Sequence, residues 1–144
     1  MTSDNRRQRV FRQMLAREAG TGAEAPAVAA AAYRLCARLA EQLTPLIGDA
    51  GVAAICARSL HLVQRRFPGL GPARASDQRE APFAYLQRAL EQQEPAVAAE
   101  AAVAVLAAAA ELLALFIGES LTTRLLREAW PDDFAGDTTE ETIT

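Results

Sequence analysis

The sequence PAVAAEAAVAVLAAAAELLALFIGESLTTRLLREAW, residues 95 to 130, decides the fold of this chain. It is the longest segment with no proline in its interior, and it is the most apolar one. When its residues are placed on a helix at roughly 100° each, apolar side chains cover more than half of the circumference, which a surface helix does not expose to water. Proline at position 95 suits a helix start, because the first turn does not use its missing N–H. The segment therefore predicts a long, central helix.

The apolar side of this segment changes direction at Gly118. Before Gly118 the apolar flank includes Val97, Val105 and Phe116, whereas after it the apolar side chains are Leu121, Leu125, Leu126 and Trp130. One interpretation is that the helix bends or restarts within one bundle, since glycine costs about 1 kcal/mol relative to alanine in a helix interior. The other is that residues 119 to 130 dock on a second copy or another protein, through Leu121, Leu125, Leu126 and Trp130.

Glu100 and Glu111 fall on the same side of this helix, three turns apart. The first interpretation is a solvated stripe on an amphipathic helix. The alternative places two carboxylates inside the protein, where burial would raise their pKa values and mark a functional site.

The composition is that of one folded domain. The chain has 144 residues, of which 51% are hydrophobic and 23% charged, enough to bury a core without disulfides or metals. The net charge of −3 disfavours general affinity for nucleic acid. Two cysteines, Cys36 and Cys56, are too few for a disulfide framework and indicate a reducing compartment. We expect a cytoplasmic protein with no signal peptide and no transmembrane segment.

Further helices are predicted at residues 5–18, 27–43, 49–67 and 82–92 by apolar side chains at helical spacing. Proline and glycine separate them at Thr44-Pro45 and again at residues 68–76. The predicted fold is all-α, a four- to five-helix bundle with a long central C-terminal helix. The predicted organisation is a basic amphipathic helix at 1–18, the bundle at 27–130 and an acidic disordered tail at 131–144.

All fifteen basic residues are arginine, and the first helix holds the densest cluster of them. The simpler interpretation is a charged face on a helix that packs on the bundle. The alternative is an arm that binds nucleic acid through Arg6, Arg7, Arg9 and Arg12.

No catalytic, metal or cofactor motif is present in the sequence. His61 is the single histidine, with neither the glutamate spacing of a di-iron helix nor the partners of a zinc site. Ser59 lies only two residues before it, on a different face of one helix, and no glycine-rich phosphate loop occurs. We therefore expect no enzyme activity, no metal and no cofactor.

Three stretches, at residues 43–48, 57–62 and 116–131, resemble segments of small uncharacterised helical proteins of GC-rich bacteria. This resemblance implies a bacterial standalone domain and carries no activity. The expected function is protein–protein interaction or regulation, with self-association as a homodimer. The alternatives are the nucleic-acid-binding module described above and a peripheral membrane-associated helical protein.

Overall fold

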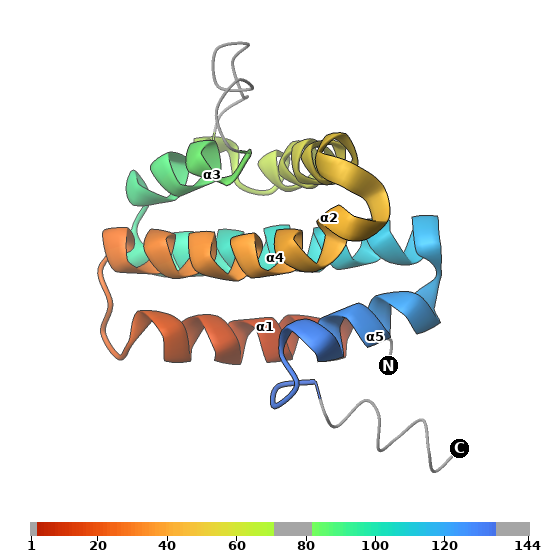
Figure 1. Cartoon of the computed structure of the whole chain (residues 1–144). Helices are drawn as coiled ribbons and strands as arrows, with labels where there is room; N and C mark the ends of the chain where they lie inside the picture. The colour runs from red at the N-terminus through yellow and green to blue at the C-terminus, as the bar shows by residue number, and fades with distance from the viewer. Residues whose placement is uncertain (1–2, 71–81, 135–144) are drawn as a thin grey trace.

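The computed structural model describes residues 3–70 and 82–134, and its regular elements are all helical (Figure 1). The all-α prediction is confirmed, and the part of the chain described contains no strand. The helices are α1 (Ser3–Ala19), α2 (Ala25–Gln64), the 3-10 turn η1 (Pro68–Leu70), α3 (Pro82–Glu91), α4 (Pro95–Ile117) and α5 (Glu119–Ala129).

The helices are arranged in layers (Figure 1). In that view α4 and the first half of α2 lie between α1 and α5 on one side and α3 with the second half of α2 on the other. α4 contacts each of the other four α-helices. All residues from 101 to 110 are buried, most of them alanine. Because alanine side chains are small, the neighbouring helices can approach α4 closely from several directions.

α2 doubles back at Gly48, whose φ of 78° and ψ of 169° lie outside the helical region. The sequence predicts a break at Thr44-Pro45, but the helix continues through Pro45 and turns three residues later. Gly48 takes the bend because only glycine adopts this positive-φ conformation without strain. The second half of α2 ends at Gln64, three residues before the predicted end.

Gly118 separates α4 from α5 and has φ 91° and ψ 159°. α5 reverses direction and packs on α4 and α2, so the long predicted helix is two helices of one fold. The Gly118 carbonyl accepts both the amide of Thr122 at 3.1 Å and its hydroxyl at 2.8 Å. These bonds start α5 without a side-chain cap.

α1 belongs to the same core as the other helices. Phe11 and Met14 are buried, and α1 contacts both α4 and α2. The prediction that the chain is disordered from residue 131 is wrong for residues 131–134. These residues form a turn in which Phe134 is buried. The Phe134 ring lies 5.6 Å from Phe11 and 6.1 Å from Trp130, between centroids, and this aromatic contact holds the turn down. The acidic residues predicted for the rest of the tail lie outside the described residues.

Candidate interaction surface

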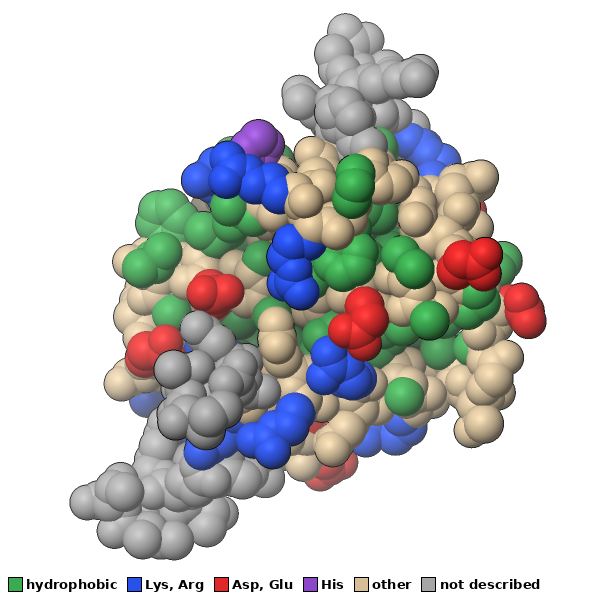
Figure 2. Space-filling model, turned by 180° about the vertical axis from the view of Figure 1, so that it is seen from behind, with side chains coloured by type: hydrophobic (Ala, Val, Ile, Leu, Met, Phe, Trp, Pro, Cys, Tyr) green, Lys and Arg blue, Asp and Glu red, His purple; other side chains and the backbone are tan. Residues whose placement is uncertain are grey.

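Three large hydrophobic side chains are exposed at one end of the molecule. Leu115 and Phe116, in the last turn of α4, are 82% and 75% exposed, and Leu46, beside the bend of α2, is 52% exposed. The end of α4 and the bend of α2 lie at the same end in Figure 1. In Figure 2, turned by 180°, hydrophobic side chains reach the surface at the corresponding left edge. We call Leu46, Leu115 and Phe116 the apolar tip.

The two glycine turns create the apolar tip. α4 stops at Gly118 and α2 turns at Gly48, and close to each turn Leu115, Phe116 and Leu46 stay uncovered while Ile117 and Ile47 pack against the core. The sequence places Phe116 on a flank that should be covered, and that expectation is wrong: Phe116 is 75% exposed, whereas Ile117 in the same turn packs against the core. The signal that could have indicated the tip is a run of large apolar residues that ends at a glycine, Leu115-Phe116-Ile117 before Gly118 and Leu46-Ile47 before Gly48.

The four residues predicted to make an intermolecular contact are turned into the protein's own core. Leu125 and Leu126 are buried, and Leu121 and Trp130 are half-buried against the same core. The apolar side of α5 faces inward because the chain reverses at Gly118. Leu125 and Leu126 are therefore unavailable to a partner, and a contact with a second copy has to be made by another surface.

The arginines of α1 differ in their surroundings. Arg12 donates to both carboxylate oxygens of Glu100, at 3.1 and 2.9 Å, and Arg17 donates to Asp133 at 2.8 Å. Arg6 and Arg9 are exposed. The basic cluster thus ties α1 to α4 and to the turn after α5, which leaves a smaller basic surface than the sequence suggests.

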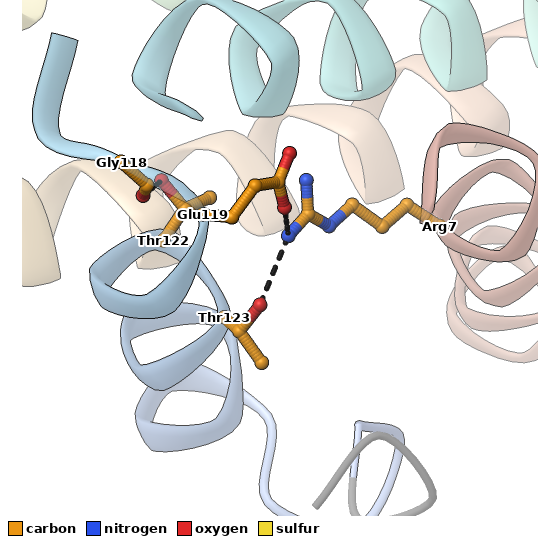
Figure 3. Close-up of polar contacts among 5 residues, drawn as sticks. All are labelled: Arg7, Gly118, Glu119, Thr122 and Thr123. Carbon is orange, nitrogen blue, oxygen red and sulfur yellow. Dashed lines mark hydrogen bonds and ion pairs between the residues drawn. The ribbon is translucent and has the colours of Figure 1, made fainter. Parts of the chain in front are cut away.

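Arg7 is the arginine of this cluster that the fold buries. Its side chain is 3% exposed, and Nη2 donates to Glu119 Oε1 at 2.8 Å and to Thr123 Oγ1 at 3.0 Å (Figure 3). Nε and Nη1 are buried with no hydrogen-bond partner among the described residues. Glu119 is the first residue of α5, at the positive end of the helix dipole, and Thr123 lies one turn further along the same helix. Glu119 therefore supplies the negative charge that this buried guanidinium needs, and together they fix the start of α5 to α1.

Glu100 and Glu111 are both exposed, so the buried-carboxylate alternative is wrong. The hydrogen bonds from Arg12 hold the pKa of Glu100 below its usual value, which is the opposite of the direction that burial would produce. A carboxylate that stays ionised at neutral pH has no proton to donate there, and its lowered pKa makes it a weaker base.

Cys36 and Cys56 line a narrow apolar pocket between the two halves of α2, α3 and α4. Its space of about 20 Å³ holds about one water molecule. Burial raises the pKa of Cys36, with a further contribution from Cys56, and burial raises the pKa of Cys56 to about 12. Because the thiolate is the reactive form, both thiols are poor nucleophiles. Ser59, in the same pocket, donates to the carbonyl of Ile55 at 2.8 Å, whereas His61 is exposed.

Within residues 3–70 and 82–134, no three histidine, cysteine or acidic side chains are grouped so that they could hold a metal ion. Two helices, α2 and α4, are long and apolar enough to cross a membrane, by length and composition alone. Most of the apolar window of α4 is buried inside the fold, as in the core helix of many globular proteins. Length and composition are therefore weak evidence that α2 or α4 crosses a membrane.

Comparison with protein-family models, with curated proteins and with solved structures finds no match to this chain.

Proposed function

We propose that this protein is a non-catalytic interaction domain, a bundle built around α4, which associates with a second copy of itself through the apolar tip. The observation that carries this proposal is the exposure of Leu115, Phe116 and Leu46 at one end of the molecule. Large exposed hydrophobic groups that gather in one place are typical of contact sites. A bacterial, cytoplasmic regulatory role belongs to the same proposal, with the two free cysteines as support for a reducing compartment.

A second copy is the partner that the tip fits best. In a twofold dimer the same patch faces itself, so an apolar tip meets an apolar tip. The three side chains expose roughly 400 Å² per copy, an ordinary size for the largest patch of a monomer. An interface of about 800 Å² in total is at the weak, transient end of protein contacts. We therefore expect a dissociation constant on the order of 10–100 µM.

Sedimentation equilibrium tests the proposal. The wild-type mass should rise with concentration from 15.4 kDa toward twice that value. A Leu115→Ser/Phe116→Ser variant should stay monomeric, because it removes apolar surface that the monomer leaves exposed. Val97→Ser is the matched control, since Val97 is 38% exposed on the same helix at its other end. A wild type that is monomeric at millimolar concentration, or a double variant that dimerises like wild type, contradicts self-association.

The nucleic-acid alternative, through Arg6, Arg7, Arg9 and Arg12, draws less support from the contacts. Arg7 is buried against Glu119, and Arg12 is paired with Glu100. A basic surface binds phosphate groups through charges that are free to replace counterions. The peripheral membrane alternative would use the apolar tip itself. It would be favoured if the wild type is monomeric and floats with lipid vesicles, and if replacing Leu115 and Phe116 abolishes the flotation.

A further inference from the structure

A cleft of about 350 Å³ lies where the ends of α1 and α5 meet the first half of α2. This volume is in the range of sites that hold a small ligand. The cleft is lined by Glu18, Arg34, Leu35, Arg38, Ala129, Trp130, Pro131, Asp132 and Asp133. It is found at the C-terminal end of α5, whereas Leu115 and Phe116 of the apolar tip end α4, before the Gly118 turn that starts α5, so each can be tested without disturbing the other.

Three of the five charged groups that line the cleft are already paired. Arg34 Nε donates to Glu18 Oε1 at 2.8 Å, and its Nη2 reaches the Glu18 carbonyl at 3.3 Å. Asp133 accepts from Arg17 at 2.8 and 2.9 Å. These contacts neutralise Glu18, Arg34 and Asp133 within the protein itself.

One cation and one anion remain. Arg38 Nε donates to the carbonyl of Ala129 at 2.9 Å, which is a neutral partner at the last residue of α5. This bond holds the guanidinium in position and leaves its two NH₂ groups without a partner in the described ranges. Asp132 is exposed and has no polar partner among those residues either. A ligand of a single charge would satisfy only one of these two groups.

The apolar wall of the cleft is rigid. The Trp130 ring packs edge-on against Phe11, with centroids 6.1 Å apart, and also contacts Phe134. Both of these phenylalanines are buried, so the indole is held by the core and its cleft side can receive an apolar group. Leu35 and Pro131 extend this surface.

We propose that the cleft binds a small zwitterion with a carboxylate, an ammonium group and an apolar side chain, the chemistry of a free α-amino acid. The carboxylate binds the NH₂ groups of Arg38, the ammonium group binds Asp132, and the side chain packs on Trp130. Planar guanidinium groups are well suited to carboxylates, and hydrogen bonds between charged groups are the stronger ones.

Trp130 is the single tryptophan of the chain, so its fluorescence reports on this cleft alone. Titration with L-phenylalanine and with L-leucine should change the emission in a saturable way. N-acetyl-L-phenylalanine lacks the ammonium group and L-phenylalanine amide lacks the carboxylate. Each derivative should bind about tenfold more weakly or worse, because it leaves one charge unpaired.

Two variants separate the two charged contacts. Asp132→Asn should remove the preference for L-phenylalanine over N-acetyl-L-phenylalanine. Arg38→Gln should remove the preference for L-phenylalanine over L-phenylalanine amide. Asp49→Asn and Arg124→Gln are the controls, since these exposed charges lie outside the cleft. Arg38 also contacts the end of α5, so circular dichroism must show that Arg38→Gln is folded. Asp132→Asn removes no such contact and is decisive alone.

The proposal is overturned if none of these zwitterions changes the emission at concentrations of up to about 10 mM, where even a weak site would fill. It is also overturned if N-acetyl-L-phenylalanine binds as tightly as L-phenylalanine, or if Asp132→Asn leaves the preference between them unchanged.

Discussion

Replacing Glu119 by glutamine tests whether the buried charge of Arg7 is held by its carboxylate partner. The change keeps the size of the side chain and an oxygen acceptor but removes the negative charge. Loss of one partner of a buried ion pair costs about 3–5 kcal/mol of unfolding free energy. Because the Glu119 side chain is 59% exposed, water screens part of the interaction, and we expect about 1–3 kcal/mol.

Arg7→Met is the complementary change. It removes the buried charge together with two N–H-bearing atoms, Nε and Nη1, that lack partners within the described residues. Buried donors without acceptors cost about 1–3 kcal/mol each, and methionine fills a similar volume. We expect this variant to be as stable as wild type or more stable by up to about 2 kcal/mol. In the Arg7→Met background, Glu119→Gln should cost only the interaction of the carboxylate with the start of α5, about 0.3–1 kcal/mol.

Urea unfolding followed by circular dichroism gives these free energies, and equal m-values show that the variants are comparable. The predicted order of stability is Arg7→Met at or above wild type, with Glu119→Gln lowest. If Glu119→Gln is as stable as wild type, or Arg7→Met is the least stable of the three, the assignment of Arg7 as a costly buried charge is refuted.

Three further results are expected. Gly118→Ala should lower the unfolding free energy by about 1–3 kcal/mol through backbone strain alone, since an added Cβ would have no atom within 4 Å; an unchanged urea midpoint contradicts this. Cys36 and Cys56 should resist iodoacetamide at pH 8 in the native protein and react in urea, and mass spectrometry counts the modified thiols. Arg12 lowers the pKa of Glu100, so this pair stabilises the fold at neutral pH, and its contribution is lost as the pH falls below about 4.5. Glu100→Gln should therefore flatten the loss of stability in acid, and an identical pH profile would refute that role.

The helices themselves were predictable from local patterns. The prolines at positions 82 and 95 predict where α3 and α4 begin. The helical spacing of apolar residues predicts α1 and α2. The sequence did not determine whether the chain reverses at Gly118. A glycine inside a helix permits either a mild kink or a positive-φ turn, and the packing of the neighbouring helices determines which of the two forms. In the structure the chain reverses, and Leu125 and Leu126 are buried in the protein's own core.

The surfaces were harder to predict than the helices. Among closely spaced arginines, helical periodicity does not tell which one meets a carboxylate from a distant helix, so the burial of Arg7 against Glu119 was not visible. Phe134 stands alone among prolyl, acidic and glycine residues, a context typical of a disordered tail, yet two aromatic neighbours bury it. The cleft unites residues 18 to 38 with residues 129 to 133, and only the tertiary fold joins them.

Distance measurement between spin labels tests the central claim, self-association through the apolar tip, most directly. Ser120→Cys places an exposed label two residues beyond the turn, and Ala96→Cys places one at the far end of α4. The native thiols are buried and should label slowly. α4 has 23 residues and is about 35 Å long. Contact between two tips should therefore give a Ser120 label separation under roughly 40 Å and an Ala96 separation of about 70 Å or more. The absence of a Ser120 distance at concentrations near 100 µM, or a short distance from Ala96 labels, contradicts the account.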